Sequence, residues 1–134
     1  MNPLLDMVLR FLLATGLGAV IGYQRERAGK TAGVRTHILV SCGAALFTLA
    51  SIYAFGVGAD TSRVAAGVVV GVGFIGGGVI FRGARGEEVA GLTTAAAIWA
   101  TAAIGLAAGA GMYALSSIAA AIIVGSLLLP KIRG

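Results

Sequence analysis

The sequence has 134 residues, of which 58% are hydrophobic and 11% charged, and its formal net charge is +5. Soluble domains carry roughly 25% charged residues, so this composition excludes a water-soluble globular protein and predicts a single transmembrane domain over residues 1–134. The basic residues lie between apolar segments, which favours topology signals over nucleic-acid binding, and the single cysteine, Cys42, excludes an intrachain disulfide.

Five apolar segments are each long enough for a transmembrane helix of about 17–25 residues, and only short loops remain between them. Lipid offers the backbone no hydrogen-bond partners, so we expect every segment to be helical. The fold class is therefore an all-α integral membrane protein, a five-helix transmembrane bundle. The expected spans are residues 4–23, 36–55, 64–81, 92–108 and 112–129.

The first span carries two opposite charges near its start. Asp6 and Arg10 are spaced i, i+4 and can pair on one helical face. Two interpretations remain open, an interfacial ion pair whose arginine reaches toward the headgroups or an intramembrane polar group that lines a cavity. Further along, Ala14, Gly18 and Gly22 form a stripe of small residues, which we expect to pack on the third span.

The third span is rich in glycine, with six glycines among its eighteen residues. In lipid, glycine permits close backbone approach and favours helix packing. Because the glycines fall on two faces, we expect this helix to be central and contacted from both sides. If it is unwound at its three consecutive glycines, its carbonyls could instead line an ion pathway. The residues concerned are Gly67, Gly71, Gly73, Gly76, Gly77 and Gly78.

The fourth span has a second small-residue stripe, at Ala97, Thr101, Gly105 and Gly109, and residues 109–111 form a very short hairpin into the last span. Charge decides the orientation. The loops at 24–35 and 82–91 and the C-terminal segment hold eight of the ten Lys and Arg, all on one side of a five-span chain. Basic loops stay in the cytoplasm, so we expect the N-terminus outside and the C-terminus inside.

Polar residues gather at the predicted cytoplasmic ends of the spans. Glu26 lies among basic residues and predicts an ion-pair network with Arg25 and Arg35, while Thr36 and Thr93 start predicted helices and can cap free N–H groups. Arg35 could also bind a phosphate or a lipid headgroup. The alternative is that these residues only set the orientation of the chain in the membrane and cap helix starts. The predicted polar cluster comprises Arg25, Glu26, Arg35, Thr36, Arg82, Thr93 and Thr94.

The sequence gives no indication of catalysis. It has no nucleophile–base–acid set, no Cys/His cluster and no phosphate-binding loop, and we interpret its single histidine, His37, as a polar cap or an interface group. Magnesium prefers carboxylate, carbonyl and water oxygens, whereas the five acids are not clustered within the predicted spans. We therefore expect no catalytic residue and no cofactor. The sequence supports Mg²⁺ binding only weakly, and no residue is assigned as a metal ligand.

Four motifs resemble the MgtC/SapB family of bacterial inner-membrane proteins. They are AGVRTHILVSCGAALF (32–47), DTSRVAA (60–66), GVGFIGGGVIFR (71–82) and GLTTAAAIWATAAIGLAAGAG (91–111). The resemblance implies a five-span protein of the bacterial inner membrane, linked to growth in low magnesium and to virulence in some pathogens. It implies either magnesium transport or, in its place, control of membrane potential or of an ATP synthase.

The sequence departs from the family's pattern at three positions. Gln24 stands where many members have an acid, Gly67 where glutamine is common, and Ala90 where a basic residue usually precedes GLTTAA. Some members also carry a soluble cytoplasmic domain after the spans. This sequence ends at Gly134, so we expect the transmembrane domain without a C-terminal soluble domain, and functions that depend on that domain are not carried over.

Two classes of function remain open for a protein embedded in a lipid bilayer. The first is a regulatory or interaction protein that acts through small-residue helix faces, either on itself as a dimer or small homo-oligomer or on another inner-membrane complex. The second is a small transporter or channel for Mg²⁺ or another ion, with a pathway beside the glycine-rich third span. Ion flux in liposomes separates the two.

Overall fold

Five helices make up the described part of the chain. The structure is a computed structural model that describes residues 2–83 and 91–130, with side chains described for 2–80 and 91–130. No helix boundary differs from the predicted spans by more than four residues, so the five-helix prediction is confirmed. The helices are α1 (Pro3–Arg27), α2 (Val34–Tyr53), α3 (Ser62–Gly83), α4 (Leu92–Gly109) and α5 (Tyr113–Leu127).

Local chemistry sets several of these boundaries. The side chain of Asn2 accepts a hydrogen bond from the backbone N–H of Leu4 at 2.8 Å, so it caps the start of α1. Before α3, the Asp60 carboxylate accepts from the backbone N–H of Ser62 at 3.0 Å and from its hydroxyl at 2.6 Å. These bonds, the hydroxyl first, lower the pKa of Asp60 because they stabilise its charged form.

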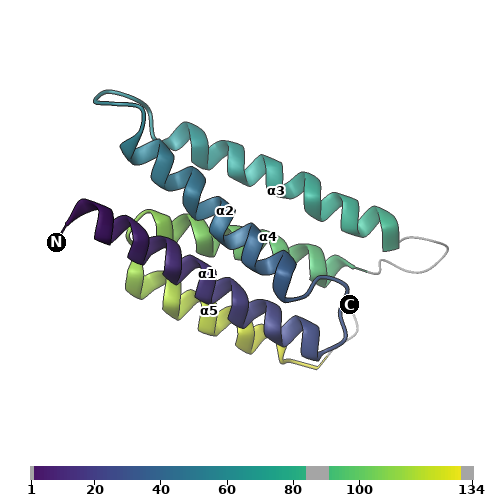
Figure 1. Cartoon of the computed structure of the whole chain (residues 1–134). Coiled ribbons are helices and arrows are strands. Elements are labelled where there is room, and N and C mark those ends of the chain that lie inside the picture. Colours follow the sequence, from purple (N-terminus) through teal and green to yellow (C-terminus); the bar gives the residue numbers. More distant parts are fainter. Residues whose placement is uncertain (1, 84–90, 131–134) are drawn as a thin grey trace.

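Successive helices run antiparallel along a common long axis, joined by short connections (Figure 1). The predicted hairpin between α4 and α5 is present, and Gly111 adopts a left-handed conformation there with φ of 90°. Only glycine adopts that conformation without strain, so it lets the chain turn back at once after α4. As a result α5 lies beside α4 and α1.

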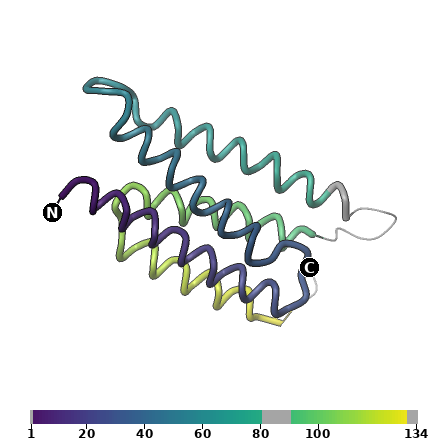
Figure 2. Tube along the Cα trace, viewed as in Figure 1, coloured from purple at the N-terminus to yellow at the C-terminus, as the bar shows by residue number. Residues whose placement is uncertain are grey.

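The central helix is α4, and the prediction that the glycine-rich third helix occupies the centre is wrong. Within the described part, α4 contacts all four other helices, whereas α3 contacts only α2 and α4. In Figures 1 and 2, α3 accordingly lies along the outer edge of the bundle, away from α1 and α5. The glycine-rich helix therefore exposes most of its surface to the surroundings of the bundle.

Three buried apolar clusters show the same arrangement, because α4 contributes to each one. Ile98 and Ala102 pack with residues of α2 and α3, Ala108 packs with α1 and α2, and Ile104 packs with α1 and α5. Alanine predominates in the first two, which lets the helices approach closely there, whereas the third contains Ile21 and Ile104 beside Ala120. Short side chains thus predominate where α4 packs on α2.

Glycines at two interfaces allow this close approach. A Cβ added to Gly18 of α1 would lie 2.7 Å from the carbonyl oxygen of His37, and one added to Gly109 of α4 would lie 2.8 Å from that of Ala45. Gly22 and Gly105 are similarly close to the α2 backbone. The predicted stripes on the first and fourth spans therefore do pack, but the α1 stripe packs on α2 and not on the third span.

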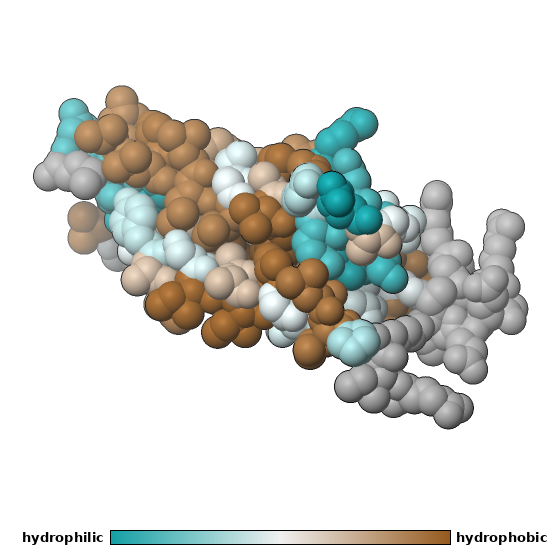
Figure 3. Space-filling model, turned by 90° about the horizontal axis from the view of Figure 1, so that it is seen from below, coloured by the Kyte–Doolittle hydropathy of each residue, from teal (hydrophilic) through white to brown (hydrophobic). Residues whose placement is uncertain are grey.

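The outer surface fits a bilayer. Figure 3 shows a mostly hydrophobic face, with strongly hydrophilic residues gathered toward the two ends of the molecule. Among the described residues, α1, α2, α3 and α4 are long and apolar enough to cross a membrane, while α5 is apolar but has only 15 residues. A helix of that length rises about 22 Å, somewhat less than the roughly 30 Å hydrocarbon core.

Candidate functional site at the two ends of α1

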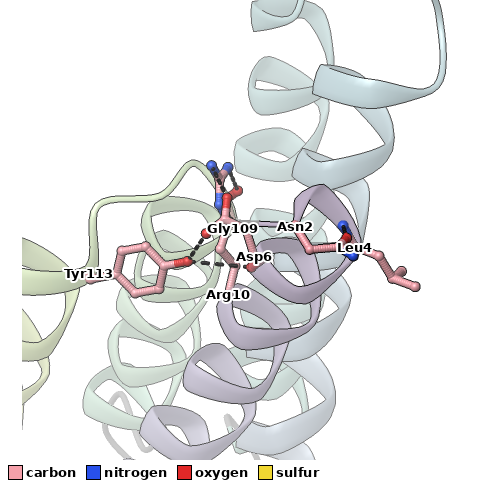
Figure 4. Close-up of polar contacts among 6 residues, drawn as sticks. All are labelled: Asn2, Leu4, Asp6, Arg10, Gly109 and Tyr113. Atoms are coloured by element: carbon pink, nitrogen blue, oxygen red, sulfur yellow. Dashed lines mark hydrogen bonds and ion pairs between the residues drawn. The ribbon is translucent and has the colours of Figure 1, made fainter.

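One polar cluster lies near the N-terminal end of α1 (Figure 4). The predicted pair is confirmed, because Arg10 Nη2 lies 2.7 Å from Asp6 Oδ2. The Tyr113 hydroxyl donates to Asp6, and Arg10 also donates to the Gly109 carbonyl at 3.0 Å. The guanidinium lies 5.7 Å from the centre of the Tyr53 ring. One ion pair thus ties the ends of four helices together.

Arg10 is suited to this place for an electrostatic reason. The last carbonyls of a helix lack intrahelical partners and carry partial negative charge. Gly109 is the last residue of α4, so its carbonyl receives a cation where the central helix ends. This geometry favours a clamp between helices over either a freely solvated interfacial pair or a cavity lining, because Arg10 bonds to α4 and Asp6 to α5.

A second polar cluster lies at the opposite end of the bundle, which we call the basic end: the C-terminus of α1, the start of α2 and the start of α4. There the structure brings together two residues of the predicted cluster, because Arg25 Nη2 donates to Thr94 Oγ1 at 2.7 Å. Both side chains are buried. Gln24 beside them donates to the Leu127 carbonyl at 3.4 Å and so contacts the last turn of α5.

The predicted ion-pair network among Arg25, Glu26 and Arg35 does not form. Glu26 is exposed, and its carboxylate accepts from the backbone N–H of Val34 at 3.2 Å, while Arg35 is exposed on α2. In residues 2–80 and 91–130 the only ion pair is Asp6–Arg10 at the other end. Glu26 therefore caps α2, and the charge of Arg25 is not balanced by its sequence neighbour.

Two predicted threonine caps are also misplaced. Thr36 is the third residue of α2 and Thr93 the second of α4, so neither occupies the capping position that precedes a helix. The capping residues are Gly33 and Gly91, which have no side chain to donate or accept. Thr93 is exposed and Thr36 partly buried. The side chain of Arg82, also part of the predicted cluster, lies outside the described residues.

Sequence reasoning gave His37 too small a role. The side chain is fully buried between α1 and α2, and its Nδ1–H donates to the Gly33 carbonyl at 2.9 Å. Four residues later, Ser41 is equally buried and donates to the Ala14 carbonyl of α1 at 2.7 Å. The i, i+4 spacing of two polar residues in an apolar span was the signal that could have revealed this interface.

For five of the six glycines predicted as a packing surface, an added Cβ would contact no other helix in the described part of the chain. A Cβ on Gly76 would contact Ala95 of α4 at 3.4 Å, which is ordinary packing distance. At the other five positions, nothing lies within 4 Å of an added Cβ. Moreover α3 is one continuous helix across residues 76–78, so the unwound pathway is not present. The unpacked positions are Gly67, Gly71, Gly73, Gly77 and Gly78.

A groove runs between α2 and α3. Its volume is about 360 Å³, and Ala102 of the central helix contributes to its floor. The walls include Leu39 and Phe47 on α2 and Val68 and Ile75 on α3, so the groove is apolar along its length. Such a surface has few oxygen ligands of the kind that a hard cation needs, whereas it fits hydrocarbon or another apolar helix.

Comparisons with known proteins agree with the transmembrane architecture. The sequence model of the MgtC family matches residues 11–132. The chain is 49% identical to the protein of Escherichia coli (strain K12) named "Putative magnesium transporter YhiD", over 82% of this chain and 54% of that protein. It is 42% identical to Protein MgtC of Brucella abortus (strain 2308), over 87% and 49%.

A further relative is Protein SapB of Bacillus subtilis (strain 168), which is 40% identical over 81% of this chain and 49% of that protein. The chain therefore spans about half the length of these three relatives. No solved structure matches it. The names of the relatives refer to magnesium in one case and leave the activity unstated in the others, so the activity has to be argued from the structure.

Proposed function

Because the chain belongs to the MgtC family, we propose that it is a regulatory protein of the bacterial inner membrane that acts by docking the exposed face of α3 against another transmembrane helix. The observation that carries this proposal is the difference between two sets of glycines. Gly18 and Gly22 of α1 and Gly105 and Gly109 of α4 meet a neighbouring backbone, whereas five of the six glycines described in α3 meet no atom of another described helix. Small residues on a membrane-exposed face are the usual means by which transmembrane helices associate.

The apolar groove supports the same proposal. Gly43 of α2 and Gly71 of α3 lie on its two walls, and neither has an atom within 4 Å of an added Cβ. A partner helix could therefore approach both backbones. The partner is either a second copy of this chain, giving a homodimer or small homo-oligomer, or a helix of another inner-membrane complex. Magnesium limitation, virulence and control of membrane potential or ATP synthesis are the settings that the family suggests for such docking.

A glycine-to-leucine comparison tests this docking. Gly77→Leu on α3 should leave the monomer folded, because the added side chain meets open space, but should abolish homo-oligomers or the complex recovered from membranes. Gly125→Leu on α5 is the matched control, since that glycine also has nothing within 4 Å. The measurement is chemical crosslinking in native membranes. Equal crosslinking of the wild type and of both variants would refute docking through α3.

The alternative is transport of Mg²⁺ or another ion. It is supported by the name of the Escherichia coli relative. The packing within the described helices favours docking instead. Buried hydroxyls such as those of Thr48 and Thr101 donate hydrogen bonds to carbonyls of their own helices and do not line a path for a cation. A cation route needs a continuous file of oxygen ligands or water. We also propose that the N-terminus lies outside and the basic end faces the cytoplasm.

A further inference from the structure

Arg25 places a positive charge in the interior of the basic end. Only 2% of the residue is exposed, and a guanidinium stays protonated at any physiological pH. A buried charge is costly unless it is paired and hydrogen-bonded. A buried arginine at this position therefore calls for an anion close by.

The described residues do not supply that anion. Arg25 bonds through Nη2 to a neutral hydroxyl, that of Thr94, and its Nε has no hydrogen-bond partner among residues 2–80 and 91–130. Of the acids in the described part, Asp6 pairs with an arginine at the other end of the bundle, Glu26 caps α2, and Asp60 caps α3. None of these three carboxylates forms an ion pair with Arg25.

The start of α4 adds to the positive potential. Thr94 is the third residue of this helix, whose first amides receive no side-chain cap from the described residues. A helix N-terminus carries roughly half a positive charge, so a cation is the unfavourable partner for it. The start of α2 provides a contrast at the same end of the bundle, because the carboxylate of Glu26 accepts its first N–H. The partial positive charge at the start of α2 is thus balanced by a carboxylate, whereas the start of α4 contacts an arginine.

His37 is a second buried group with an unused bonding site. It is fully buried, its Nδ1–H donates to the Gly33 carbonyl, and its Nε2 has no partner among the described residues. Its Cβ would lie 3.0 Å from a Cβ added to Gly22 of α1, and Arg25 follows one turn later on that helix. Two buried polar side chains, Arg25 on α1 and His37 on α2, thus each leave a nitrogen atom without a hydrogen-bond partner among the described residues of the basic end. Apolar packing does not account for either of these buried polar groups.

We propose that Arg25, Thr94, the first turn of α4 and His37 form a binding site for a phosphate group. Guanidinium N–H groups, a hydroxyl and helix N-terminal amides are the donors that commonly hold phosphate in proteins. The group belongs either to an anionic lipid headgroup or to a free phosphate. Exposed Arg35 at the same end raises the local concentration of either anion.

The test is the thermal stability of the purified full chain in nonionic detergent. It is titrated with inorganic phosphate against chloride at matched ionic strength, and with dioctanoyl phosphatidylglycerol against dioctanoylglycerol, which lacks the phosphate. We expect stabilisation by a phosphate-bearing probe and not by its control. A response to phosphatidylglycerol alone identifies the lipid headgroup, and a response to inorganic phosphate identifies the free anion.

The variants assign the response to the site. Thr94→Val and Arg25→Lys should each raise the half-maximal concentration of the probe by about 10- to 100-fold, the range expected for one lost bond to a charged group. Arg27→Gln, an exposed arginine two residues away on the same helix, should leave it unchanged. If Arg25→Lys fails to fold, Thr94→Val still decides, because it keeps the arginine.

Three results would overturn the proposal. The first is no stabilisation by any phosphate-bearing probe. The second is an equal loss of response in Arg27→Gln, which would indicate a diffuse surface effect. The third concerns Glu87 and Glu88, which lie outside the described residues. If the double variant Glu87→Gln/Glu88→Gln loses stability and gains a phosphate response that the wild type lacks, a carboxylate of the chain itself is the anion.

Discussion

Adding one methyl group at Gly105 should separate α2 from α4 and destabilise the whole bundle. In the structure, the Cβ of an alanine at this position would lie 2.8 Å from the carbonyl carbon of Ser41 and would meet its carbonyl oxygen more closely still. Both atoms belong to the α2 backbone, so no side-chain rotation can relieve the contact. The two helices must move apart by at least about 0.7 Å to reach ordinary van der Waals separation.

The expected magnitude follows from two opposing effects. Overpacking a tight interface costs about 1–3 kcal/mol, and alanine returns up to about 1 kcal/mol through its higher helix propensity. We therefore expect Gly105→Ala to lower the free energy of unfolding by about 1–2 kcal/mol. The matched control is Gly77→Ala on α3. Nothing lies within 4 Å of its added Cβ, so that variant should be neutral or slightly more stable.

Reversible unfolding of the detergent-solubilised protein by sodium dodecyl sulfate, followed by circular dichroism, measures both variants on one scale. The same glycine-to-alanine change is made in α4 and in α3. The helix in which it lowers the free energy of unfolding more is therefore the more tightly packed, central helix. If Gly77→Ala were the damaging variant and Gly105→Ala the neutral one, the glycine-rich helix would be central after all and the arrangement described here would be incorrect.

Other consequences can be checked separately. Ser41→Ala removes a buried bond to the α1 backbone and should cost about 0.5–1.5 kcal/mol in the same unfolding assay. The lowered pKa of Asp60 means that its cap on α3 contributes fully above its unfolded pKa of about 3.9 and is lost as the pH falls through the lower folded value. Protection against hydrogen exchange at the start of α3, relative to the intrinsic rate at each pH, should therefore fall only in acid, and Asp60→Ala should remove that pH dependence. In a Cys42→Ser background, Ala59→Cys should react with an impermeant maleimide in intact cells, whereas Lys30→Cys should not; the reverse labelling would invert the topology.

The helices were predictable because lipid leaves the backbone few choices. A long apolar segment in a membrane must satisfy its own N–H and C=O groups, so α1 to α4 follow from hydropathy alone. The ion pair of Asp6 and Arg10 followed from their spacing on one helix. What hydropathy could not supply was the arrangement of helices, since every segment is apolar and lipid does not distinguish an inner helix from an outer one.

The glycines show why the central helix was misassigned. Glycine permits close approach but does not require it, so Gly71 of α3 and Gly105 of α4 look alike in sequence while only the second meets a backbone. A better signal is the size of the other residues. Alanine, glycine and threonine occupy 13 of the 18 positions of α4, so it can be surrounded, whereas valine, isoleucine and phenylalanine occupy 10 of the 22 positions of α3.

The basic end was only partly predictable for a related reason. Arg25 and Thr94 were both singled out, but their contact depends on the register between α1 and α4, which no local pattern specifies. Glu26 looked like a partner for Arg25 because it is adjacent in sequence. Neighbouring residues on a helix point in directions about 100° apart, so the helix turned one side chain inward and the other toward the start of α2.

Ion flux tests the proposed function most directly. The purified chain is reconstituted into liposomes that contain a magnesium-sensitive dye, and a Mg²⁺ gradient is imposed across the membrane. A docking protein should leave the membrane sealed, so the dye signal should match that of protein-free liposomes. A saturable Mg²⁺ influx that rises with the amount of protein would contradict the account and assign transport to the chain.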